Sequence, residues 1–185
     1  FATQAGQPLA TALADGTVVV SDDSGETWRT VAQGPPILSM VWDDGGALYL
    51  GTAGEGIYRL GPAGVAQPLR ADDSELDEGD VHHLAAPQGR LVAATPTLLF
   101  TRDDATGAWT RSEPVYDGIM ALVALDSGPI YVGTEVSGVW VTPDAGQTWQ
   151  PAAVAELGFA PGQMVAVTAL AADPAEPGVL YAAVD

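Results

Sequence analysis

A short strand-like motif recurs along the whole chain, and this repetition restricts the fold more than any other feature of the sequence. Each copy begins with Leu or Ile and continues with aliphatic, aromatic or small residues, and three copies end in Gly-Thr or Ala-Thr. The copies lie at residues 9–13, 48–52, 91–95, 130–134 and 180–184. Consecutive copies therefore begin about 40 to 50 residues apart, a spacing that indicates repeats of a few strands each.

Three other kinds of strand-like segment keep the same phase. Apolar runs precede the motif at residues 37–42, 81–86, 119–125 and 165–172. A third strand follows it at 17–22, 56–60, 97–102 and 138–142, and a fourth at 27–31, 66–69, 108–112 and 148–152. Turn residues separate these segments, and no window has a helical period long enough to compete.

The sequence therefore predicts an all-β fold, a β-propeller of four-stranded antiparallel blades. We expect one propeller segment over 1–185, with blades at about 1–33, 34–70, 78–114 and 118–154 and a partial fifth at 164–185. A blade of two strands would leave an unpaired edge. We therefore expect about four blades plus a partial fifth, within a larger ring.

An eight-residue turn, Ser/Thr-x-Asp-x-Gly-x-Thr-Trp, occurs twice between the third and fourth strands. Its Asp is expected to accept hydrogen bonds from its own loop, and its Gly to allow a positive φ. Its Trp is expected to fill space between blades. The two copies are Ser21, Asp23, Gly25, Thr27, Trp28 and Thr142, Asp144, Gly146, Thr148, Trp149; a degenerate copy has Asp103, Gly107 and Trp109.

These turns resemble the repeats of the Asp-box superfamily, also called bacterial neuraminidase repeats. The resemblance covers essentially the whole chain. The superfamily includes sialidases, xyloglucan-cleaving endoglucanases, the sortilin ectodomain and the photosystem II assembly factor type. It implies that the Asp boxes are structural rather than catalytic, and that ligands bind on the opposite loops. The three clustered arginines of a sialidase are not recognisable here.

Charge excludes two classes of partner. The chain has a formal net charge of -18, with six Arg, no Lys and 24 carboxylates. It therefore offers no basic groove for nucleic acid and no attraction to anionic lipid. Its apolar runs are too short for membrane insertion, and it has no Cys for thiolate chemistry or Cys-ligated metals.

Several loop residues are candidates for a site. Glu55 and Glu135 occupy matching loops two blades apart, where two carboxylates could act as acid and base on a glycoside. The alternative is that they are ordinary exposed loop residues. Other candidates for the ligand face are Tyr116 and Asp117, in a connection between blades, and His83, on a first strand of a blade.

The acidic segment 72–80 contains the densest cluster of charges. Asp72, Asp73 and Asp77 could bind Ca²⁺, but the segment lacks the spacing of a defined calcium loop, which favours a solvated acidic loop. No catalytic motif is recognisable. We therefore predict a non-catalytic propeller, without a cofactor, that binds a protein partner or assembly outside the cytoplasm. The alternative is a glycoside hydrolase or carbohydrate-binding propeller.

Overall fold

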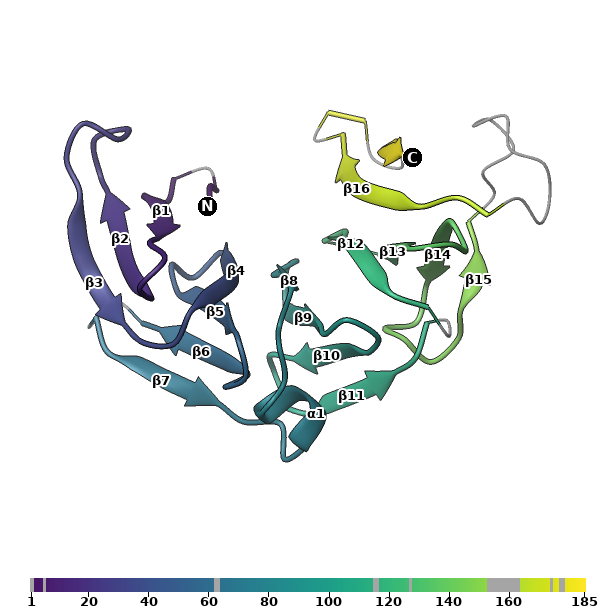
Figure 1. The fold of residues 1–185 in the computed structure, drawn as a ribbon, viewed down its shortest axis with the longest axis horizontal. Helices are drawn as coiled ribbons and strands as arrows, with labels where there is room; N and C mark the ends of the chain where they lie inside the picture. Colours follow the sequence, from purple (N-terminus) through teal and green to yellow (C-terminus); the bar gives the residue numbers. More distant parts are fainter. Residues whose placement is uncertain are drawn as a thin grey trace. The chain divides into compact units, whose positions relative to one another are not determined.

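The chain folds as a set of antiparallel β-sheets of the β-propeller type (Figure 1). The computed structural model describes residues 2–4, 6–61, 64–114, 117–126, 128–152, 164–173, 175–176 and 179–185. In these ranges there are five sheets, of three, four, four, four and two strands, and a single short helix. None of the described residues forms a helix long and apolar enough to cross a membrane.

The first two sheets follow the chain without crossovers. The three-stranded sheet has the order β1-β2-β3 and the next has the order β4-β5-β6-β7. Their strands are β1 (Leu9–Ala12), β2 (Thr17–Ser21), β3 (Arg29–Gln33), β4 (Ile37–Trp42), β5 (Leu48–Thr52), β6 (Ile57–Leu60) and β7 (Ala66–Leu69).

The later sheets repeat this meander. The third has the order β11-β10-β9-β8, the fourth β12-β13-β14-β15, and the last pairs β16 with β17. Their strands are β8 (His83–Ala85), β9 (Arg90–Ala94), β10 (Leu99–Asp103), β11 (Trp109–Ser112), β12 (Ile119–Ala124), β13 (Ile130–Thr134), β14 (Val139–Thr142), β15 (Gln150–Pro151), β16 (Val167–Ala172) and β17 (Leu180–Val184).

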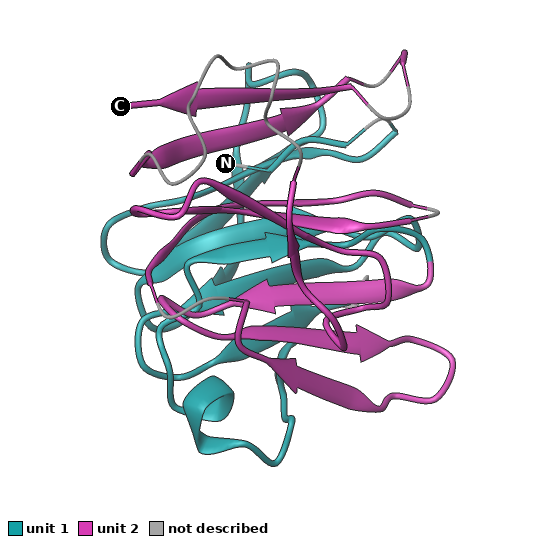
Figure 2. Ribbon diagram, turned by 90° about the vertical axis from the view of Figure 1, so that its right-hand side faces the viewer, with its two compact units in different colours: residues 1–88 teal, residues 89–185 magenta. Residues whose placement is uncertain are grey.

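Two compact units divide the chain at residues 88 and 89 (Figure 2). In unit 1, residues 1–88, apolar residues from the first two sheets form one core that includes Val18, Val20, Leu48 and Leu50. In unit 2, residues 89–185, a cluster around Val139, Val165 and Val167 packs against Tyr131 and Leu170. Burying these apolar side chains is what holds neighbouring sheets together inside each unit.

Four of the five copies of the recurrent motif occupy the second strand of their sheet, whereas the copy at residues 9–13 forms β1, the first strand of its sheet. The glycine that two of the copies contain has a packing reason. A Cβ on Gly51 would come within 2.6 Å of the Val81 carbonyl oxygen. A Cβ on Gly133 would lie 2.7 Å from Val167 Cγ1. At both of these glycines, therefore, the backbone lies too close to the next apolar run for a larger residue to fit without a shift.

The first strands of three sheets, β4, β12 and β16, share a bulge that the sequence did not predict. The pairing register shifts between Ile37 and Ser39 in β4, and between Ile119 and Ala121 in β12. β16 has the same shift between Val167 and Ala169. A bulged residue leaves the ladder and its side chain is re-aimed. Leu38 and Met120, the residues at two of these bulges, are accordingly 43% and 42% exposed.

Local structure adds one element and corrects one expectation. The acidic segment 72–80, expected to be a solvated loop, contains the helical turn α1 (Ser74–Asp77), whose N-terminus is capped by the Asp73 side chain. Trp28, expected to fill space between blades, is 43% exposed, because its indole lies over its own turn and donates to the Gly25 carbonyl oxygen at 3.1 Å.

Candidate functional site

A cleft of about 410 Å³ opens in unit 1 where the first two sheets meet. Its walls come from the six strands β2 to β7, from the connection between β3 and β4, and from the loop between β5 and β6. The volume lies within the range of small-molecule and side-chain pockets. Its lining residues are Gly16, Val18, Ala32, Gln33, Gly34, Pro35, Ile37, Leu50, Thr52, Glu55, Tyr58 and Ala66.

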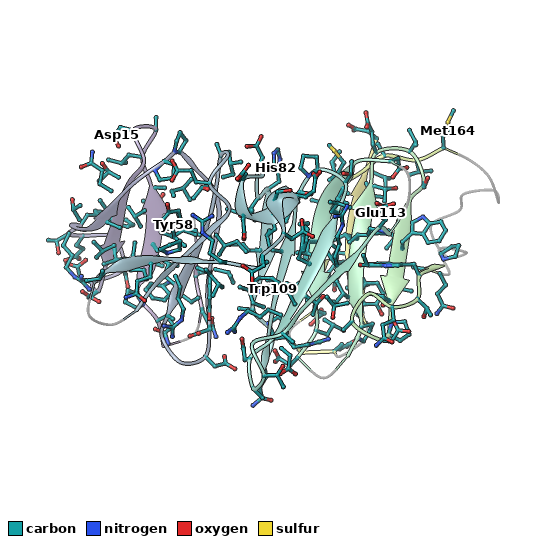
Figure 3. The ribbon with its side chains drawn as sticks, turned by 90° about the horizontal axis from the view of Figure 1, so that it is seen from below. Asp15, Tyr58, His82, Trp109, Glu113 and Met164 are labelled. Atoms are coloured by element: carbon teal, nitrogen blue, oxygen red, sulfur yellow. The ribbon has the colours of Figure 1, made fainter. Side chains whose placement is uncertain are left out.

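Glu55 and Tyr58 supply the polar pair of this cleft. The Tyr58 hydroxyl donates to Glu55 Oε2 at 2.8 Å, and this hydrogen bond raises the pKa of Tyr58 above its usual 10.0. Tyr58 lies on β6 with its ring against the core of unit 1 (Figure 3). The Glu55 backbone N–H donates to the Thr52 hydroxyl at 3.2 Å, which fixes the start of the loop.

The corresponding loop of unit 2 contains Glu135. Its side chain is exposed, and its Oε2 would lie 3.3 Å from a Cβ built on Gly118. Asp117 Oδ2 accepts from the Val136 backbone N–H at 3.3 Å, while its Oδ1 is buried without a hydrogen-bond partner. Glu55 and Glu135 thus belong to different units, and neither unit by itself brings them together. Tyr116 lies outside the described residues.

His83 is half-buried on β8, and His82 precedes it as an exposed residue. Their ring centroids are 6.4 Å apart with the planes tilted by 51°. His82 Nε2 lies 4.0 Å from Asp80 Oδ2 at the surface. The described residues include no group of three or more His, Cys, Asp or Glu side chains that could hold a metal ion.

Two of the three calcium candidates, Asp73 and Asp77, accept hydrogen bonds from their own loop. Asp77 accepts the backbone N–H groups of Ala71 and Asp72, at 2.8 and 3.1 Å. Asp73 accepts the Glu75 N–H at 3.0 Å as the cap of α1. These carboxylates fold the loop around α1, because orphan N–H groups at a helix start need acceptors.

The turn at residues 21–28 is closed by its own side chains. The Ser21 hydroxyl donates to Asp23 Oδ1 at 2.7 Å and accepts the Gly25 N–H at 2.7 Å. Asp23 also accepts both the backbone N–H and the hydroxyl of Thr27, at 2.9 and 2.5 Å. The Thr27 hydroxyl is the largest of the contacts that lower the pKa of Asp23 to about 2.

The turn at residues 142–149 repeats this network. Thr142 donates to Asp144 at 2.7 Å, and Thr148 donates to it through both its N–H and its hydroxyl, at 2.8 and 2.6 Å. The pKa of Asp144 is again about 2, chiefly because of the Thr148 hydroxyl. The Trp149 indole N–H, by contrast, is buried without an acceptor.

In the degenerate turn, Thr106 takes the place of the motif's Thr, which the sequence pattern did not predict. Asp103 Oδ1 accepts the N–H and hydroxyl of Thr106, at 2.7 and 2.8 Å. Thr106 stands three residues after the Asp instead of four, and so it does not match the motif. A search for any Thr or Ser within one turn of the Asp would have found it. Trp109, next to this turn, is half-buried on β11 (Figure 3).

No known protein-family description matches the chain, and no curated protein resembles it in sequence. Solved structures do resemble it. The extracellular domain of BT4673 from B. thetaiotaomicron matches with a TM-score of 0.71 and 16% identity over 94% of this chain. YCF48 bound to D1 peptide matches with 0.64 and 15% over 89%, and a chain of the mitotic checkpoint complex with 0.69 and 15% over 94%.

The chain spans only part of each of these proteins: 24% of the BT4673 chain, 54% of the YCF48 chain and 52% of the checkpoint chain. At these identities the likeness is one of fold. Together with the five antiparallel meander sheets, it shows that this chain has the β-propeller fold.

Proposed function

We propose that this chain is a segment of a non-catalytic Asp-box propeller that binds a protein partner or a multi-subunit assembly outside the cytoplasm. The observation that carries the proposal is the use of Asp23 and Asp144. Each accepts its hydrogen bonds from its own turn, which is a structural role. The carboxylates of Asp23 and Asp144 therefore stabilise their own turns and do not serve a ligand. The loops at the other end of the strands are the proposed binding surface.

The solved structures support a protein partner. YCF48 is described as bound to D1 peptide, and the checkpoint chain is part of a complex. The extracellular domain of BT4673 is consistent with a location outside the cytoplasm.

One observation favours a second candidate function. Glu55 and Tyr58 stand together at an open cleft, and a carboxylate beside an aromatic side chain is a usual start for a carbohydrate site. The second candidate is therefore carbohydrate binding or glycoside hydrolysis at this cleft.

One set of experiments separates the two. The tagged protein is used to isolate partners, which are identified by mass spectrometry and confirmed with purified components; a glycan array and a glycoside hydrolysis screen run in parallel. A confirmed protein partner without glycan binding supports the proposal. Glycoside turnover that is abolished by Glu55→Gln or Glu135→Gln would overturn it in favour of the second candidate.

A further inference from the structure

The polar groups of the cleft in unit 1 are mainly hydrogen-bond acceptors. Glu55 is the only charged residue in its lining, and it is exposed. The Tyr58 hydroxyl hydrogen is already donated to Glu55. The Thr52 hydroxyl donates to the Gly56 carbonyl oxygen at 2.9 Å. Apart from the Gln33 amide, the side chains of the cleft therefore have no free strong donor to offer, whereas no group in the described part of the chain donates to Glu55 Oε1.

The rest of the wall is apolar. Val18 and Leu50 are 1% and 2% exposed, and Ile37 is half-buried beside them. A ligand that fits both parts of the cleft has an aliphatic stem and a head that donates hydrogen bonds and carries positive charge. Arginine and lysine side chains have this construction, because their stems pack on apolar surface while their charged heads reach polar groups.

Arginine fits better than lysine. Its planar guanidinium donates in two directions at once and stacks on aromatic rings, whereas an ammonium is a strongly hydrated point charge. Tyr58 provides the ring and Glu55 the acceptor. The net charge of -18 also attracts basic partners over longer distances.

We propose that this cleft binds an arginine side chain of the partner protein, with Glu55 as the acceptor and Tyr58 as the residue that positions it. The proposal rests on the protein-binding function proposed above and names the chemistry of the partner. Arg70 is a cation whose charge acts on Tyr58 from outside the cleft. It is not part of the lining and donates to the Asp77 carbonyl oxygen at 2.9 Å, but its charge reaches Tyr58 and opposes a second cation.

The test uses fluorescent Gly-Ser peptides that carry a single central Arg, Lys, citrulline or Leu, with binding followed by anisotropy. We expect the Arg peptide to bind about tenfold more tightly than the citrulline peptide, which has the same shape without the charge. Glu55→Gln should remove this difference, and Tyr58→Phe should weaken Arg binding a few-fold.

Two further variants sharpen the test. Glu26→Gln removes an equal charge from an exposed position of the same unit that is not in the cleft, and should leave Arg binding unchanged. Arg70→Gln should strengthen it about twofold at low salt, because a repelling charge is removed. Circular dichroism melting of each variant checks that it is folded.

Equal affinity for the Arg and citrulline peptides, or an unchanged affinity in Glu55→Gln, would overturn the inference. So would a confirmed protein partner that binds wild type and Glu55→Gln equally well, although that result would leave the proposed function standing. Failure to isolate any protein partner, with glycans bound instead, would overturn the proposed function itself.

Discussion

Asp23 and Asp144 hold equivalent places in two separate turns, and their surroundings agree closely. Each carboxylate accepts hydrogen bonds from one Thr side chain, that Thr's backbone N–H, and the hydroxyl at the start of the turn. Because all of these donors favour the charged form, the pKa of each falls from 3.8 to about 2. The turns therefore make folding sensitive to acid.

The first prediction concerns this acid sensitivity. Between about pH 4 and about pH 2 the unfolded chain binds more protons than the folded chain at Asp23 and Asp144, so the stability they contribute is present above pH 4 and is lost as the pH falls toward 2. In Asp144→Asn we expect a lower melting temperature at pH 7 and a smaller further drop between pH 5 and pH 2 than in wild type, as measured by circular dichroism. The drop in Glu26→Gln should equal that of wild type.

The second prediction compares two glycines. Gly25 and Gly146 have φ of 98° and 99°, where a side chain is strained. At Gly25 a Cβ would make only ordinary contacts, with Trp28 at 3.7 Å and Leu9 Cδ1 at 3.9 Å, but at Gly146 it would lie 2.6 Å from Ser112 Oγ. Gly25→Ala should cost about 1–2 kcal/mol and Gly146→Ala about 2–4 kcal/mol of unfolding free energy in urea titrations. Equal losses would show that backbone strain alone sets the cost.

Single residues differ in how far the sequence predicts them. The partners of Asp23 and Asp144 lie within their own octapeptides, so local spacing suffices. The exposure of Trp28 does not follow from its type, because its indole finds an acceptor in its own turn. The Glu55–Tyr58 hydrogen bond could be suspected from a spacing of three residues across a tight loop, but the cleft beside it could not, since its walls come from segments 16 to 66.

At the scale of elements, the strands β5 and β13 set how closely the next apolar run can approach. Gly51 and Gly133 occupy the same place in two copies of the recurrent motif. The Ser39 hydroxyl, next to Gly51, donates to the Val81 carbonyl oxygen at 2.8 Å. Ala94, at this place in β9, is fully buried. The motif thus requires a small residue because of the packing between sheets, not because of the strand.

The third prediction tests this packing. Gly133→Ala would place a methyl group against Val167 and should cost about 1–3 kcal/mol of unfolding free energy, the usual range for overpacking a core. Gly51→Ala should have a similar effect in unit 1. Gly128→Ala and Gly61→Ala are the controls, because a Cβ there meets nothing within 4 Å or only Arg59 Nη1 at 3.8 Å. A loss in the controls equal to that at Gly133 would contradict the packing explanation.

The ends of a strand could be predicted where the apolar pattern stops at a cluster of turn residues. The observed bounds of β4, β5, β7, β13 and β17 are those expected from the sequence. The outer strand β15 is shorter than expected, because an exposed edge strand is little constrained by the apolar pattern. Helix α1 could not be predicted, since one turn held by Asp73 and Asp77 carries no periodicity. The bulges of β4, β12 and β16 depend on pairing, which the alternation of residues does not encode.

At the scale of the whole molecule, negative charge is in large excess. There are 24 carboxylates and six Arg. The ion pair of Arg29 with Asp22 has side chains 61% exposed on both sides, and such pairs contribute little. Arg90 instead donates to the carbonyl oxygens of Leu125 and Gly128, at 3.0 and 2.9 Å, which carry no full charge. Self-repulsion should therefore be stronger than ion-pair attraction.

The fourth prediction follows from this balance. Raising NaCl from about 0.01 M to about 1 M shortens the screening length from about 30 Å to about 3 Å. Salt therefore screens the repulsion between carboxylates that lie farther apart than this length. We expect the melting temperature to rise by several degrees over this range, and by less in a variant that carries Asp72→Asn and Glu75→Gln, two exposed acidic positions near α1. Sucrose, which is uncharged and does not screen charges, should raise the melting temperature of both proteins by similar amounts.

The same experiment distinguishes two origins of stability in an acidic chain. If melting temperature falls as NaCl is added, then the Arg–carboxylate pairs contribute more than their exposure indicates, and repulsion is not the main term. If it rises equally in wild type and in the variant, salt acts through apolar burial rather than charge. Only a rise in melting temperature that is smaller in the variant supports the view that repulsion between carboxylates destabilises the folded chain. A basic partner bound to the acidic surface would reduce this repulsion.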